Sequence, residues 1–192
     1  SLAGTGVIGS EVMESQSWEI AKQMGAVEET LKFNKKLTSL AYDVVKSETN
    51  TDTIKSQIEA SIKTYKTEIK DSPYAFYIND GVISKLQSIA DSPWLLTFIR
   101  TNPQDYISKV KCSVLAINGS KDLQVLSKLN LNSIEAHLNK AENKDFTIKE
   151  LEGLNHLFQT SETGNPNEYG KLEETFSKDA LELIKDWIKE RF

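Results

Sequence analysis

The chain has 192 residues, of which 39% are hydrophobic and 27% charged, and a formal net charge of −5. This length allows one domain with a core, or a domain that carries a large insertion. The acidic balance argues against a broad nucleic-acid-binding surface, and no apolar run is long enough to span a membrane. A single cysteine, Cys112, excludes an internal disulfide and a multi-thiolate metal site. Nothing in the composition calls for a cofactor, and it leaves the cellular compartment open.

Residues 1–9 are predicted to be the end of a buried strand that runs into a glycine-rich turn. The turn, Gly4-Thr5-Gly6-Val7-Ile8-Gly9, matches the G-x-G-x-x-G dinucleotide pattern, and Glu28 and Glu29 lie near the expected place of a ribose-binding acid. In nucleotide-binding proteins that acid ends a second strand, whereas residues 11–47 have a helical pattern. We therefore interpret the segment as a strand and turn of an α/β core.

Residues 10–105 are predicted to be helical almost throughout, without a convincing strand. Ser10 is expected to cap the first helix, and Ser92 to cap a later one that has Pro93 at its first position. The clearest helix carries apolar residues at intervals of three or four: Ile54, Ile58, Ile62, Tyr65 and Ile69.

The pattern changes in residues 106–192. Residues 114–117 form a continuous apolar run, as in a strand buried on both faces. A helix is predicted over about 124–140, and a second strand is marked by Phe146, Ile148 and Leu151. Ser177 is expected to cap a last helix that packs on the sheet. The order strand, helix, strand, helix is typical of a parallel α/β layer.

Each predicted strand of this region is followed by a turn with an ionisable side chain. Asp122 follows the first strand and His156 the second, and ligand-handling groups of parallel sheets lie just beyond the carboxyl ends of the strands. A carboxylate there can orient an imidazole, and the pKa of histidine suits proton transfer near neutrality. Each residue also has a structural interpretation, Asp122 as a turn or helix cap and His156 as a hydrogen-bonded loop residue. His137 lies within a predicted helix and is interpreted as structural or exposed.

An acid after one strand and a histidine after the next follow the chain order of α/β-hydrolases. Residues 114–125 resemble the acid-bearing segment of bacterial α/β-hydrolases of the serine-aminopeptidase-like and esterase-like groups, and residues 153–159 resemble their histidine turn. The resemblance implies a partial α/β-hydrolase fold, a few-stranded parallel sheet with flanking helices, in which residues 1–9 and 106–192 form the core and residues 10–105 an all-helical lid. It also implies a serine hydrolase that cleaves ester or amide bonds with a Ser-His-Asp triad.

The nucleophile of such a triad is missing from the sequence. No G-x-S-x-G elbow occurs in the 192 residues, and the candidate substitutes Ser10 and Ser120 do not lie on a strand-to-helix elbow. The resemblance places the nucleophile and the oxyanion-hole loop before Ser1. We therefore expect Asp122 and His156 to act in a longer parent enzyme, and the 192 residues alone to be inactive.

Two further hypotheses remain open at this stage. One is that the chain is a non-catalytic α/β module that binds a ligand or a protein partner in the lid cleft. The other is that it is a helical interaction domain fused to a small α/β layer. The last of these predicts that Asp122 and His156 lie far apart. The exposed edge of the N-terminal strand also predicts self-association. The loop 160–169 is a candidate flank of the site. Aromatic residues of the helical region are candidates for an acyl pocket: Tyr74, Phe76, Tyr77, Trp94 and Phe98.

Overall fold

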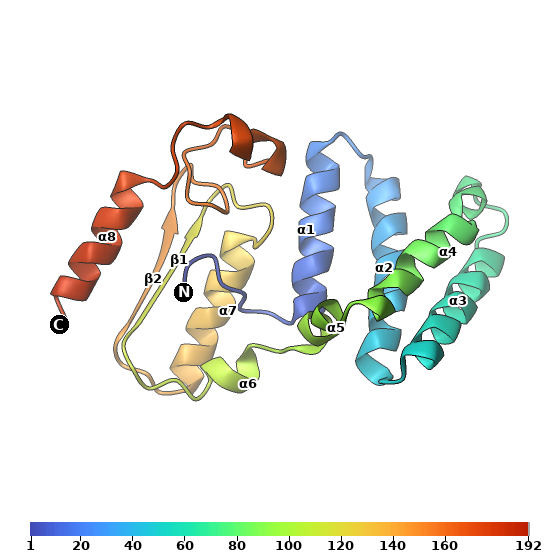
Figure 1. Cartoon of the computed structure of the whole chain (residues 1–192), viewed down its shortest axis with the longest axis horizontal. Helices are drawn as coiled ribbons and strands as arrows, with labels where there is room; N and C mark the ends of the chain where they lie inside the picture. The colour runs from blue at the N-terminus through green and yellow to red at the C-terminus, as the bar shows by residue number, and fades with distance from the viewer. Residues whose placement is uncertain (192) are drawn as a thin grey trace. The chain divides into compact units, whose positions relative to one another are not determined.

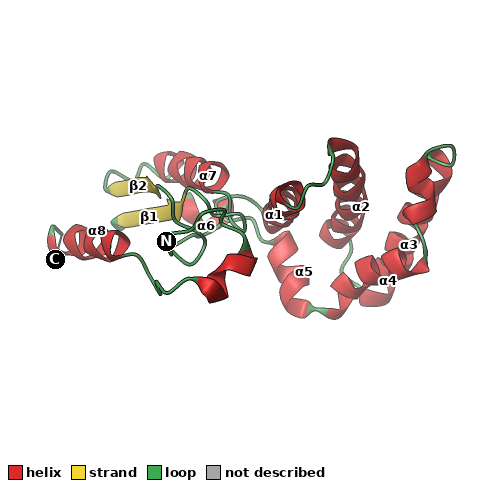
Figure 2. Ribbon diagram, turned by 90° about the horizontal axis from the view of Figure 1, so that it is seen from above, coloured by secondary structure: helices red, strands yellow, loops and turns green. Residues whose placement is uncertain are grey.

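The computed structural model describes residues 1–191, which form two compact units (Figure 1). The sheet unit contains Ser1–Gln23 and residues 102–191, and the helical unit contains Met24–Thr101. Most of the secondary structure is helical, and the strands form a small parallel sheet (Figure 2). The predicted α/β class is confirmed at this level.

The sheet consists of β1 (Val114–Gly119) and β2 (Phe146–Leu151), which are joined by α7 (Ser127–Lys140). The two strands are parallel, with Val114 opposite Phe146 and Gly119 opposite Leu151. Both predicted strands and the helix between them are therefore confirmed. Because the two strands are parallel and end opposite each other, the turns that follow them lie at the same end of the sheet, beyond the carboxyl ends of the strands.

The N-terminal segment runs parallel to β1 on the edge away from β2. The Ile117 N–H donates to the Ser1 carbonyl (3.0 Å), and the Ala3 N–H donates to the Ile117 carbonyl (2.9 Å). Ile117 thus uses both of its backbone groups on this side. The predicted strand at residues 1–9 is present only as a single bridge between Leu2 and Ile117.

Helices cover both faces of the sheet, with α7 on one face and α8 (Lys178–Lys189) on the other (Figure 2). Alternate residues of β1 point to opposite faces, as the pleat of a strand requires. Ala116 packs with the α7 residues Leu131, Ile134 and Leu138. Leu115 and Ile117 belong to the cluster on the α8 face, with Ala3, Leu154, Phe158 and Ala180.

Helix α1 (Gly9–Gln23) belongs to the sheet unit, so the helical unit is shorter than the predicted range 10–105. The side chain of Gln23 explains part of this attachment, because its Nε2 donates to the Thr163 carbonyl (2.5 Å) and its Oε1 accepts from Asn165 Nδ2 (3.0 Å). The prediction of Ser10 as the helix cap is wrong. Helix α1 begins one residue earlier, and Ser10 is buried in its first turn.

The helical unit consists of α-helices and two short 3₁₀ helices that pack around buried apolar side chains. Ile54, Ile58 and Ile62 of α3 are all fully buried, as their spacing predicted. The predicted cap of α5 is confirmed, since Ser92 Oγ accepts from the Leu95 N–H (3.2 Å). The elements of this unit are α2 (Glu28–Ser47), α3 (Thr51–Glu68), η1 (Pro73–Tyr77), α4 (Asp80–Gln87), η2 (Ser88–Asp91) and α5 (Pro93–Arg100).

This arrangement contradicts the dinucleotide interpretation of the glycine-rich turn. Glu28 and Glu29 form the first turn of α2, so the glycine-rich turn is not followed by the second strand that a dinucleotide site needs. No helix within residues 1–191 is long and apolar enough to cross a membrane. The remaining helices, both in the sheet unit, are α6 (Gln104–Ile107) and η3 (Pro166–Lys171).

Candidate functional site

The turn after β1 holds Asp122 in a buried position. The Asp122 N–H donates to the Gly119 carbonyl (3.2 Å), which closes the turn. Asp122 Oδ1 accepts from the backbone N–H groups of Gln124 and Val125, both at 2.8 Å. These bonds keep residues 124 and 125 in a turn, which explains why α7 begins at Ser127 and not near residue 124 as predicted. Asp122 thus stabilises the turn, as one of its structural interpretations predicted, but does not cap α7, and its second oxygen is left for another partner.

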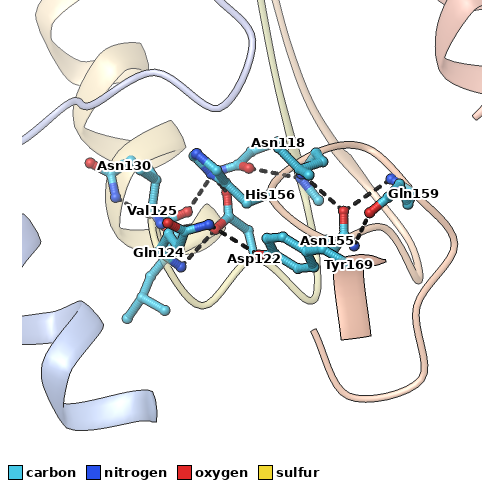
Figure 3. Close-up of polar contacts among 12 residues, drawn as sticks. Asn118, Asp122, Gln124, Val125, Asn130, Asn155, His156, Gln159 and Tyr169 are labelled. Carbon is cyan, nitrogen blue, oxygen red and sulfur yellow. Dashed lines mark hydrogen bonds and ion pairs between the residues drawn. The ribbon is translucent and has the colours of Figure 1, made fainter. Parts of the chain in front are cut away.

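The turn after β2 is built around the fully buried side chain of Asn155 (Figure 3). Its Oδ1 accepts from the N–H groups of Leu157 (2.9 Å) and Gln159 (3.0 Å), and its Nδ2 donates to Gln159 Oε1 (3.0 Å). Phe158 takes a left-handed backbone conformation here (φ 58°). Asn155 therefore fixes the backbone on both sides of His156.

Backbone contacts join the two turns directly. The Lys121 N–H donates to the Leu154 carbonyl (3.0 Å), and the Gly153 N–H donates to Ser120 Oγ (2.8 Å). A Cβ added to Gly119 would lie 2.0 Å from the Leu154 carbonyl oxygen. Position 119 therefore requires glycine, because the backbones of the two turns approach too closely there for any side chain.

This arrangement brings the two predicted site residues together. His156 Nδ1 lies 2.8 Å from Asp122 Oδ2, and the side chain of Asp122 is completely buried whereas that of His156 is 27% exposed. An ionised carboxylate only accepts hydrogen bonds, so Nδ1 carries the proton that it donates to Asp122. His156 Nε2 has no hydrogen-bond partner among residues 1–191, and no buried side-chain nitrogen or oxygen in that range lacks one, so Nε2 is accessible. We call Asp122 and His156 the dyad.

The hypothesis of a helical interaction domain fused to a small α/β layer predicted that Asp122 and His156 lie far apart, and this prediction is wrong. A carboxylate that holds the proton on Nδ1 leaves Nε2 as a proton acceptor. The dyad can therefore take a proton from a hydroxyl group that approaches Nε2 and stabilise the cation that forms.

Tyr169 is a site residue that the sequence did not single out individually. It lies in η3, and its hydroxyl accepts a hydrogen bond from Gln124 Nε2 (3.1 Å), two residues after Asp122. Burial raises the pKa of Tyr169, and the nearby charge of Asp122 adds to this effect. The sequence made the loop 160–169 a candidate flank of the site. Its last residue, Tyr169, lies beside the turn that holds Asp122, which we call the acid turn (Figure 3).

The loop that carries Tyr169 is held by polar contacts with the acid turn. Lys121 Nζ donates to the carbonyl oxygens of Ser161 (2.9 Å) and Glu162 (2.7 Å). Glu168 accepts from the hydroxyl groups of Ser161 and Thr163, and these bonds lower the pKa of Glu168 to about 2. Lys121 therefore ties the loop to the turn that holds Asp122, and Glu168 stabilises the loop internally.

Other candidate residues do not join the dyad. Ser120 Oγ is occupied by the Gly153 N–H, and Ser10 is buried in α1. His137 lies on α7, where Nε2 shares a hydrogen bond with Ser133 Oγ (3.1 Å). Residues 1–191 contain no group of three or more His, Cys, Asp or Glu side chains that could hold a metal ion.

The aromatic residues proposed for an acyl pocket separate into two sets. Tyr74 and Tyr77 line a groove of the helical unit. Phe76 and Trp94 are 85% and 69% exposed, and neither lines that groove. Trp94 stacks on Phe98 at the surface of α5 (5.2 Å between ring centroids).

No protein-family model, no curated protein and no solved structure matches this chain. The functional interpretation therefore rests on the geometry of the dyad and of the turns that hold it.

Proposed function

We propose that the chain supplies the acid and the base of a serine hydrolase that cleaves ester or amide bonds. The observation that supports this most directly is the 2.8 Å contact between His156 Nδ1 and Asp122 Oδ2, formed by turns that follow two adjacent parallel strands. The proposal includes a fold assignment. The sheet unit is part of an α/β-hydrolase core, and the helical unit is its lid.

In this mechanism a serine from a G-x-S-x-G elbow outside these 192 residues attacks the acyl carbonyl. His156 takes the serine proton at Nε2 and then gives it to the leaving alcohol or amine. Asp122 keeps the proton on Nδ1 and stabilises the imidazolium cation. Water repeats the sequence on the acyl-enzyme and restores the serine.

The test is fluorophosphonate labelling of the product of the complete reading frame that encodes these residues. We expect labelling of one serine in a G-x-S-x-G sequence. His156→Ala should lower the labelling rate by about 10²- to 10⁴-fold, the usual contribution of a positioned general base. Asp122→Ala should lower it by a smaller factor, because the acid acts through the histidine.

The matched control is His137→Ala, which removes the other histidine of the chain from a site on α7. This variant should label at the wild-type rate. Equal labelling of His156→Ala and the wild type would overturn the proposal, and so would the absence of labelling in a folded full-length protein. The second result would favour the non-catalytic binding module.

The 192 residues on their own should not turn over p-nitrophenyl esters above the rate of free imidazole. The reason is that the dyad has no nucleophile to activate, since loss of the serine removes most of the catalysis of a triad. Robust turnover that disappears in His156→Ala would show that the nucleophile lies within the chain, and would contradict this part of the proposal.

A further inference from the structure

The helical unit contains a groove between α2, η1 and α4. Its volume is about 830 Å³. This lies in the range of small-molecule sites, which are mostly apolar with a few polar groups that orient the ligand. The groove is lined by Thr30, Phe33, Asn34, Leu37, Thr38, Pro73, Tyr74, Tyr77, Asn79, Val82, Lys85 and Leu86.

The apolar side chains of the groove are held by packing. Phe33, Leu37 and Leu86 are each less than 10% exposed, so they belong to the core of the helical unit. The Phe33 and Tyr74 rings stack with 4.9 Å between centroids, and the Tyr74 hydroxyl is 3.2 Å from Thr30 Oγ1. These contacts fix the rings in place, so the surface that a ligand would meet exists before it binds.

Lys85 is the one lining side chain with a full charge. Its ammonium group makes no hydrogen bond or ion pair within residues 1–191, whereas Lys55 and Lys63 of the same unit are paired with Asp91 (2.5 Å) and Glu59 (2.5 Å). An unpaired cation beside an apolar surface attracts a ligand that has an anionic end and an apolar body.

We propose that this groove binds an aliphatic monocarboxylate, with the chain against Leu37, Val82 and Leu86 and the carboxylate at Lys85. This inference goes beyond the proposed hydrolase activity. It concerns the helical unit alone and does not depend on the dyad.

The first measurement is the titration of the 192-residue chain with sodium decanoate, monitored by isothermal calorimetry and by the backbone amide chemical shifts. We expect saturable binding, with shift changes concentrated in residues 30–38 and 73–86. 1-Decanol should bind more weakly, because it lacks the charge that Lys85 attracts. Absence of saturable binding, or shift changes elsewhere, would overturn the proposal.

Two variants separate the charge from the cavity. Lys85→Gln should weaken decanoate binding by up to about fivefold, the range of an exposed ion pair, and should abolish the preference for decanoate over decanol. Val82→Trp should remove binding of both molecules by filling the groove. If Val82→Trp does not fold, Thr38→Trp fills the groove from the opposite helix, and the wild-type shift map still locates the site.

The controls are Lys70→Gln and His156→Ala. Lys70 is an exposed lysine of the same unit that lies outside the groove, so its loss should leave decanoate affinity unchanged. Equal weakening in Lys70→Gln and Lys85→Gln would show attraction to the general charge of the unit and would overturn the site. His156→Ala should bind decanoate normally, so the result is independent of the hydrolase proposal.

Discussion

Asn155 shows how much the dyad depends on a side chain that does no chemistry. It makes three hydrogen bonds within its own turn and is fully buried. Buried donors that lose their acceptor are costly, because they gave up their hydrogen bonds to water on folding. At the scale of single residues, the position of His156 is thus determined by its neighbour in the chain.

Asn155→Ala should lower the free energy of unfolding by about 2 kcal/mol, since the buried Gln159 N–H and the partly buried Leu157 N–H lose their acceptor. Urea unfolding followed by circular dichroism measures this. The matched control is Asn139→Ala on α7, an exposed asparagine whose loss should change stability by less than about 0.5 kcal/mol. Equal effects of the two substitutions would contradict the role given to Asn155.

Glu168 gives the loop beside the dyad a pH-dependent stability. Hydrogen bonds from Ser161 and Thr163 lower the pKa of Glu168 from 4.5 to about 2. A carboxylate whose pKa is lower in the folded state stabilises that state above the unfolded pKa, and this contribution is lost as the pH falls through the folded pKa. The effect should therefore be complete above about pH 5 and decline between pH 4.5 and pH 2.

Glu168→Gln should thus be less stable than the wild type at pH 7, with a difference that shrinks as the pH falls below 4.5. Urea midpoints of both proteins at pH 7, 4 and 3 test this. Glu162→Gln, in the same loop, serves as the control because its carboxylate is exposed and makes no hydrogen bond within residues 1–191. A Glu168→Gln difference that is constant over this pH range would contradict the assignment.

At the scale of elements, the two strand-end turns behave as one structure because their backbones touch at Gly119. Gly119→Ala would place a Cβ 2.0 Å from the Leu154 carbonyl and 2.8 Å from that of Asn155. We expect a loss of about 3 kcal/mol in unfolding free energy, the upper part of the usual range for overpacking. Thermal or urea unfolding measures it.

Gly170→Ala is the matched control, because a Cβ there has no atom within 4 Å. It should change stability by less than about 0.5 kcal/mol. If Gly119→Ala is as stable as this control, the close approach of the two turns is not a constraint on the sequence.

The elements that the sequence predicted well are those with local signals. The apolar run before Asn118 predicted β1, and Ser92 before Pro93 predicted the cap of α5. Contacts between distant residues left no such signal. Tyr169 is 45 positions from its partner Gln124, and the attachment of α1 depends on bonds from Gln23 to residues some 140 positions away.

The dyad itself could be predicted because it needs only chain order. An acid and a histidine that follow neighbouring parallel strands both lie beyond the carboxyl ends of those strands, whatever the length of the connection between them. What could not be predicted is the hydrogen-bond network that aims His156, because an asparagine such as Asn155 is equally common in ordinary turns.

At the scale of the whole molecule, the two edges of the sheet differ in the residues that they carry. Leu2 and Ala3 lie on one edge, and the N–H and C=O of Leu2 have no backbone partner within residues 1–191. On the other side, β2 carries the exposed charged residues Lys149 and Glu150. Charged residues discourage strand pairing, whereas an apolar edge invites it.

The 192-residue chain should therefore self-associate through its N-terminal edge. We expect the molar mass from light scattering to rise with protein concentration, and Leu2→Lys to suppress the rise. Leu181→Lys is the control, because Leu181 is similarly exposed (51% against 52% for Leu2) but lies on α8. Suppression by Leu181→Lys alone would assign the association to α8 and contradict pairing at the edge.

The close contact of the strand-end turns has a consequence for how the chain tolerates changes in length. Only the spacers from Gly119 to Asp122 and from Leu151 to His156 determine where the dyad forms, because the strand register fixes both starting points. The connection from Lys140 to Phe146 joins the opposite end of the sheet. An insertion there would disturb the hydrogen bonds of the buried Asn143 but would leave both spacers unchanged, whereas an insertion in either spacer would move one member of the dyad away from the other.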